Sequence, residues 1–92
     1  MHDAATIAPV MRALADPTRR SLFERIAKAG EITAGALAKG ATVSQPAISQ
    51  HLRALREAKL VSERRAGKHI HYRAEPAGLA PMVDWLSFYG EL

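Results

Sequence analysis

The 92-residue sequence contains no cysteine, so disulfides, thiolate metal sites and thiol redox sensing are excluded. No apolar run approaches the ~20 residues of a membrane-spanning helix, and the first residues lack the pattern of a secretory signal, so we expect a cytoplasmic protein. No serine has histidine and acid partners at a recognisable catalytic spacing, and no glycine loop is suited to holding a phosphate. We therefore do not expect an enzyme.

The composition is that of one small globular domain covering residues 1–92, with 48% apolar residues. The formal charge is +4 and is unevenly distributed. Residues 53–73 carry seven cations and two acids, whereas residues 74–92 carry three acids and no cation. This asymmetry indicates that a polyanion meets the middle of the chain, although a merely solvated basic surface has the same composition.

Periodicity and cap residues predict a mainly α domain with one small β-hairpin. Asp16, Thr33 and Ser44 each have the side chain of a helix N-cap and precede apolar residues at helical spacing. Gly67 supplies the flexible tip of a hairpin between two extended runs. We expect helices over residues 4–15 (with a start or bend at Pro9), 17–28, 33–39, 44–58 and about 77–89, and a hairpin over 60–73, in the order α-α-α-α-β-β-α.

The segment from Ala41 to Leu55 has the pattern of a DNA-recognition helix. Ile48, Leu52 and Leu55 form a stripe that faces the core. The opposite face is rich in uncharged hydrogen-bonding side chains, which suit base edges, whereas an ordinary solvated face would more usually carry Glu and Lys. The predicted DNA-reading residues are Ser44, Gln45, Pro46, Ser49, Gln50 and Arg53.

A hairpin directly after two helices joined by a short turn predicts a winged helix-turn-helix. Cations on such a wing can reach backbone phosphates or the neighbouring minor groove, and cations at the start of the second helix can add phosphate contacts. The predicted wing and phosphate contacts are Arg19, Arg20, Arg64, Arg65, Lys68 and His69.

Three runs, ALADPTRRSLFERI, AISQHLRALREAKLV and RRAGKHIHYRAEP, resemble the ArsR/SmtB family of bacterial winged helix-turn-helix repressors over about residues 8–76. Ser44, Ser49, His51 and Leu52 carry the family's S-x-x-x-x-S-x-H-L pattern, with the hairpin at a fixed distance after it. The resemblance implies a homodimer that occupies an inverted-repeat operator in double-stranded DNA, blocks transcription and is released by an effector. It also implies dimerisation through the first and last helices.

The apolar residues of the two ends favour a dimer on physical grounds as well. They offer more apolar surface than one small core comfortably hides, and a two-fold axis would bury it while placing two recognition helices roughly 34 Å apart. The ordinary alternative is that they complete the core of the monomer. The predicted interface consists of Ile7, Val10, Met11, Leu14, Leu79, Met82, Val83, Leu86 and Tyr89.

The signal that such a repressor would sense is left open. The third helix has no Cys-x-Cys site and the last helix has no histidine to accompany Asp84, so the family's usual metal sites are absent and we expect no metal cofactor. The C-terminal LAPMVDWLSFYGEL resembles the W-x-x-x-Y/F ending of a metal-independent subgroup. Its Trp85, Phe88 and Tyr89 are interpreted as core more readily than as an effector pocket.

Two alternatives differ in function. One is a winged-helix protein interaction module that does not bind specific DNA sites. The other is a metal-sensing repressor with an atypical site built from His69, His71 or His2. The ordinary interpretation of these histidines is wing contact or solvent exposure for His69 and His71, a frayed terminus for His2 with Asp3, and packing or a phosphate-side position for His51.

Overall fold

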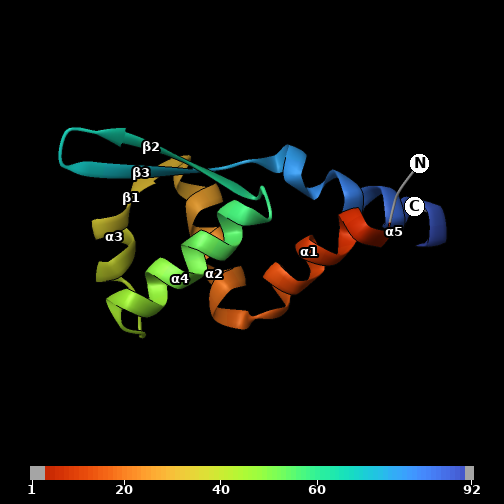
Figure 1. Cartoon of the computed structure of the whole chain (residues 1–92), viewed down its shortest axis with the longest axis horizontal. Helices are drawn as coiled ribbons and strands as arrows, with labels where there is room; N and C mark the ends of the chain where they lie inside the picture. Colours follow the sequence, from red (N-terminus) through yellow and green to blue (C-terminus); the bar gives the residue numbers. More distant parts are fainter. Residues whose placement is uncertain (1–3, 91–92) are drawn as a thin grey trace.

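The computed structural model describes residues 4–90 as an elongated molecule of 43 × 24 × 21 Å. The wing and the helix-turn-helix form one end, and α1 with α5 forms the other (Figure 1). No helix in the described part of the chain combines the length and apolar character needed to cross a bilayer. The elements are α1 (Ala4–Ala15), α2 (Pro17–Ala29), β1 (Glu31–Thr33), α3 (Ala34–Lys39), α4 (Gln45–Glu57), β2 (Val61–Ala66), β3 (His69–Ala74), the 3-10 helix η1 (Pro76–Leu79) and α5 (Ala80–Gly90).

The three predicted N-caps are confirmed. The Asp16 carboxylate accepts a hydrogen bond from the Arg19 backbone N–H at 3.0 Å at the start of α2. Thr33 caps α3 and Ser44 caps α4, each accepting from the backbone N–H three residues later, at 3.2 and 3.3 Å. Each bond satisfies a backbone donor that has no partner within its helix, so the local sequence determines where these helices begin.

The sheet has three strands, one more than the sequence predicted. Its order is β1-β3-β2, and both pairings are antiparallel. Residues 31–33, where we expected a connection and the first residue of a helix, pair instead with β3 from Glu31↔Arg73 to Thr33↔His71. The last helix also differs from the expectation, because the 3-10 helix η1 precedes α5. Otherwise the predicted winged helix-turn-helix order is confirmed.

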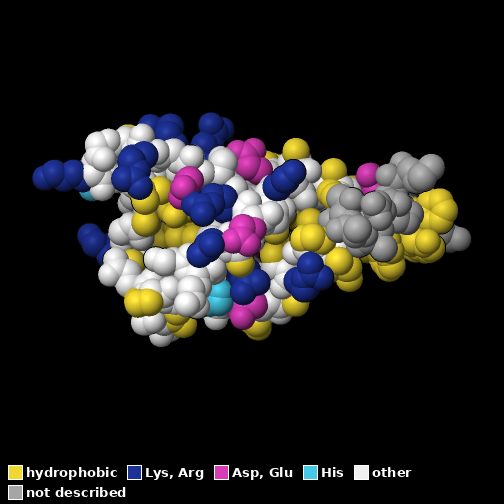
Figure 2. All heavy atoms as spheres, viewed as in Figure 1, with side chains coloured by type: hydrophobic (Ala, Val, Ile, Leu, Met, Phe, Trp, Pro, Cys, Tyr) yellow, Lys and Arg dark blue, Asp and Glu magenta, His cyan; other side chains and the backbone are white. Residues whose placement is uncertain are grey.

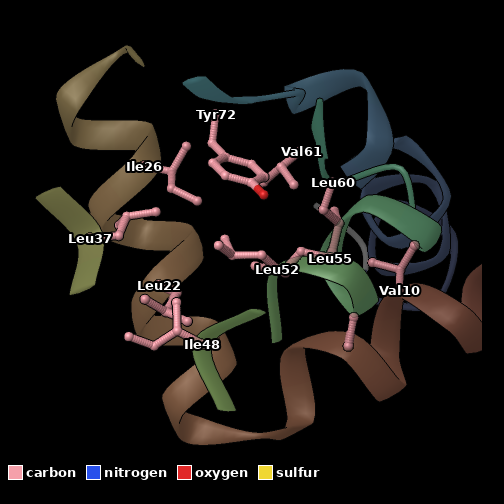
Figure 3. Close-up of a cluster of buried hydrophobic side chains, with 11 residues drawn as sticks. Val10, Leu22, Ile26, Leu37, Ile48, Leu52, Leu55, Leu60, Val61 and Tyr72 are labelled. Carbon is pink, nitrogen blue, oxygen red and sulfur yellow. The ribbon is translucent and has the colours of Figure 1, made fainter. Parts of the chain in front are cut away.

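The core lies where α2, α4 and the sheet meet, with α3 and α1 closing two sides (Figure 3). Ile26, Leu37, Leu55 and Leu60 are fully buried. Figure 3 shows Tyr72 reaching from β3 toward the side chains of α2 and α4. Ile48, Leu52 and Leu55, the predicted inner stripe of the recognition helix, are all buried, which confirms the orientation assigned to α4.

The two terminal helices pack against each other and leave apolar surface exposed. Ile7 and Val10, both placed in the predicted dimer interface, are already buried within the single chain and leave little surface for a partner. The interpretation of Trp85, Phe88 and Tyr89 as core is wrong for the single chain, because their exposed fractions are 37%, 69% and 59%. The other large exposed apolar side chains are Met11, Val83 and Leu86.

Candidate nucleic-acid interface

The predicted DNA-reading face of α4 is exposed along its whole length. The side chains of Gln45, Ser49 and Gln50 form no hydrogen bond with any other residue that the structure describes, so their donors and acceptors are available to a ligand. Ser44 is partly engaged, because its hydroxyl oxygen caps the helix while its proton can still be donated. Arg53 is paired with Glu57 at 3.0 Å, one turn along the helix, in an exposed position. Pro46 is exposed beside Gln45.

Arg25, a residue that the sequence analysis did not single out, ties α2 to α3 just before the turn that leads to α4. Its guanidinium on α2 donates to the carbonyl oxygens of Leu37 at 2.9 Å and Ala36 at 3.3 Å. Gly40 leaves room for this guanidinium, since a Cβ there would lie 2.8 Å from Arg25 Nη2. Nothing local in the sequence indicates this contact, because Ala36 and Leu37 lie 11 and 12 residues further along the chain than Arg25.

Some cations of the wing form an ion pair with an acid of the same chain, and others do not. Arg64 donates to both carboxylate oxygens of Glu31 on β1, at 3.1 and 3.2 Å, and this contact holds the pKa of Glu31 below its usual range. Arg65 and Lys68, nearer the tip, form no ion pair within residues 4–90. Arg73, at the base of β3, also forms no ion pair within the described residues, so the wing carries free positive charge at its base and at its tip, and the tip projects past α3 in Figure 1.

The other predicted phosphate contacts sit at the start of α2. Arg19 Nε donates to His51 Nδ1 on α4 at 3.4 Å, and the Arg20 guanidinium donates to the Leu14 carbonyl at 2.8 Å. His51 is half-buried, which fits the packing position expected for it. Accepting from Arg19 requires a neutral imidazole with its proton on Nε2. Each arginine retains further N–H groups that could meet a phosphate.

A further ion pair ties the end of the recognition helix to the wing. Arg56, in the last turn of α4, contacts Glu63 on β2 at 2.6 Å. Tyr72 lies opposite Glu63 in the register of β2 and β3, and burial, together with the Glu63 charge, raises the pKa of Tyr72. These contacts join α4 to the hairpin, so the two candidate DNA-contacting elements keep a defined relative position.

The histidines of β3 lie on the sheet face that also carries Arg64. The ring centroids of His69 and His71 are 6.5 Å apart, and His71 Nδ1 is 3.9 Å from Glu31. His2 and Asp3 lie outside the described residues. Within residues 4–90, no cluster of three or more histidine, aspartate or glutamate side chains is suited to holding a metal ion.

Figure 2 shows the charge distribution that results. Lysine and arginine side chains spread over the wing and helix-turn-helix, and hydrophobic side chains gather at the opposite end around α5. The arrangement offers a polar, hydrogen-bonding helix face and a basic wing at one end and an apolar surface at the other. A duplex with a phosphate backbone and readable base edges matches the first surface.

Comparison with known proteins decides the family. Residues 14–64 match a helix-turn-helix domain family. The HTH-type transcriptional regulator Rv2034 of Mycobacterium tuberculosis is 48% identical over 77% of this chain and 65% of its own length. The transcriptional repressor SdpR of Bacillus subtilis is 36% identical over 84% of each chain. A crystal structure of an ArsR family transcriptional regulator superposes with a TM-score of 0.88 at 25% identity, covering 99% of this chain and 94% of that one.

The chain belongs to the ArsR family. ArsR-family proteins are DNA-binding transcriptional regulators rather than enzymes, and the winged helix-turn-helix expected from the sequence is the fold of this ArsR-family member. The matched domain begins at Leu14 and ends at Arg64, so it includes α2, α3 and α4. This chain spans just under two thirds of the length of the mycobacterial relative.

Proposed function

We propose that this ArsR-family protein is a homodimeric, sequence-specific repressor that occupies an inverted-repeat operator. The observation that carries the proposal is the exposed face of α4, where Gln45, Ser49 and Gln50 have unengaged hydrogen-bonding groups above a fully buried inner stripe. Glutamine can pair with an adenine edge in the major groove, and serine can pair with several bases. The B. subtilis relative is named as a repressor, which supports the direction of regulation.

Phosphate contacts would position this face on the duplex. Arg65 and Lys68 at the wing tip are the cations best placed for this role, because they have no ion-pair partner within the described chain. Arg19 and Arg20 add charge at the start of α2. Such contacts supply affinity without sequence preference, whereas the side chains of α4 supply the preference.

The apolar end supports the dimer. Met11, Val83 and Leu86 are 49%, 55% and 42% exposed, and Phe88 and Tyr89 beside them are more exposed still. A contiguous apolar surface of this kind marks an interaction site in a protein of this size. A two-fold axis through it would set two copies of α4 roughly one turn of DNA apart. In this proposal the partly buried Leu14, Leu79 and Met82 line the base of the interface.

The double substitution Gln45→Ala with Ser49→Ala tests the proposal. We expect it to remove discrimination between the operator and unrelated DNA while leaving the weaker, salt-dependent binding in place. The measurement is fluorescence anisotropy on both DNAs. The matched control is Glu24→Ala with Lys28→Ala, an exposed and charge-neutral pair of changes on α2 that should leave operator affinity unchanged. Unchanged operator affinity in the Gln45/Ser49 variant would show that α4 is not the reading element.

A further inference from the structure

Two adjoining hollows run along α1, on the side of the molecule where the recognition helix ends. One, of about 300 Å³, lies between α1, the end of α4 and η1. The other, of about 290 Å³, continues along α1 to the start of α2. Both are lined by Pro9, Glu57 and Ala58, so they adjoin one another, and together they are named the α1–α4 trough. Each hollow is at the lower end of the size range of small-molecule sites.

The hollow beside η1 is lined mostly by apolar groups, the hollow toward α2 has polar and apolar groups in similar proportion, and cations lie at both ends of the trough. Val10, Ala13 and Ala54 belong to the lining, and Figure 3 shows Val10 beside the end of α4. Arg12 at one end and Lys59 at the other form no side-chain hydrogen bond or ion pair with any residue that the structure describes. Arg19 adds a third cation.

Glu57 is the one acid in the lining, and its carboxylate is already paired with Arg53. The trough therefore has an excess of positive charge around an apolar floor. This combination suits a ligand with an apolar body and an anionic head.

The trough also borders a rigid contact at the end of the recognition helix. Lys59 closes α4 with a φ of +63°, and the Leu60 N–H returns to the Leu55 carbonyl at 2.9 Å. Gly78 of η1 packs so closely on this end that a Cβ there would lie 2.1 Å from the Lys59 carbonyl oxygen. Because η1 and the end of α4 are in backbone contact, a ligand in the trough would contact α1 on one side and this joined unit on the other.

We propose that the α1–α4 trough is a binding site for an amphipathic organic anion, such as a carboxylate with an aliphatic or aromatic body. Arg12 and Lys59 bind the head and the alanine and proline side chains cover the body. A second part rests on the proposed function: the occupied trough shifts α4 and lowers operator affinity. Pro81 is the α5 residue in the lining, and none of the exposed apolar side chains that the dimer would use lines the trough, so occupancy does not require the dimer to separate.

Decanoate is the probe, titrated into the full chain by calorimetry without DNA. We expect binding to the wild type, weakened at least about fivefold by Arg12→Gln because a charge-assisted contact is lost. Ala58→Leu fills both hollows and should abolish binding. Lys28→Gln removes the same charge from the end of α2, outside the trough, and should bind like the wild type. Circular dichroism melting confirms that each variant is folded.

Three outcomes overturn the site: no binding up to ~1 mM decanoate, equal affinity in the wild type and Arg12→Gln, or weakening by Phe88→Ser on the apolar surface rather than by Arg12→Gln. Operator affinity is then measured with decanoate at saturation. A fall in the wild type but not in Ala58→Leu supports the regulatory part, and an unchanged affinity overturns that part alone. Since the calorimetry contains no DNA, failure of the trough is distinguishable from failure of the repressor proposal.

Discussion

At the scale of single residues, the N-cap of α2 links pH to stability. The hydrogen bond from the Arg19 N–H holds the pKa of Asp16 below its ordinary value. A carboxyl with a depressed folded pKa contributes stability that is present above its unfolded pKa and is lost as pH falls through the folded pKa. The negative charge also lies at the positive end of the helix.

Asp16→Asn keeps a capping oxygen but removes the charge. We expect the wild type to be the more stable protein near neutral pH, and the difference in free energy of unfolding to shrink as pH falls below about 4. Urea unfolding over a pH series measures it. A difference that stays constant down to acidic pH would show that the Asp16 charge is not coupled to folding.

Position 78 requires glycine because the backbone of Lys59 lies very close to it, and not because the chain turns there. Because a Cβ at this position would meet backbone atoms of Lys59, which cannot swing aside, Gly78→Ala should lower the free energy of unfolding by about 1–3 kcal/mol. Gly35 is the matched control, since it sits in a helix and a Cβ added to it would have no atom within 4 Å. Gly35→Ala should be neutral or stabilising by up to about 1 kcal/mol. Equal urea midpoints for the two variants would contradict the close contact.

Hydrogen bonds of single side chains were predictable from the sequence where the partner lies only a few residues away along the chain. The caps at Asp16, Thr33 and Ser44 bond to groups three residues away, and their sequence signals were sufficient. Arg25 and Glu31 were missed, because Arg25 bonds 11 and 12 residues along the chain and Glu31 bonds 33 residues along. No local pattern encodes such contacts.

At the scale of elements, the wing's contribution depends on which cations are free. Arg65→Ala should weaken binding to operator and unrelated DNA alike and reduce the slope of log affinity against log salt by about one. Arg64→Ala should cost less, because Glu31 already neutralises that guanidinium. Salt titrations of both variants provide the comparison. A larger loss from Arg64→Ala than from Arg65→Ala would show that Glu31 releases Arg64 when DNA binds.

The ion pair between Arg64 and Glu31 shows why the structure and charge of the wing were only partly predictable from the sequence. The hairpin was found from its β-branched and aromatic residues and Gly67, which has a φ of +60°. Strand β1 was missed because three residues give no measurable alternation, and it is a strand only because β3 lies beside it. Through Glu31, that missed strand changes the charge of the predicted wing.

At the scale of the whole molecule, the proposed DNA-reading face and the apolar surface lie at opposite ends. Leu86→Glu places a charge in the apolar surface and should convert a dimer into a monomer with much weaker operator binding, because one half-site contact is lost. Sedimentation equilibrium measures the change. Ala29→Glu, which adds the same charge at the exposed end of α2, should remain a dimer. A wild type that sediments as a monomer on its operator would contradict the proposed assembly.

The sequence identified the apolar ends but not how they divide between core and surface. Val10 and Leu86 have similar apolar character, yet Val10 is 3% exposed and Leu86 42%. Helical periodicity shows that a face is apolar, whereas the neighbouring element decides whether it is already covered. For α1 the neighbouring elements include the core and α5, whereas α5 packs mainly against α1 and η1 among the described elements.

The central claim, sequence-specific DNA binding, is tested most directly by footprinting the purified protein on DNA from its own upstream region. The experiment uses excess unrelated competitor and a salt series from ~50 to ~200 mM. We expect a protected inverted repeat that survives competitor. Binding that competitor and salt remove equally from every fragment would contradict the claim, leaving a basic surface without sequence preference.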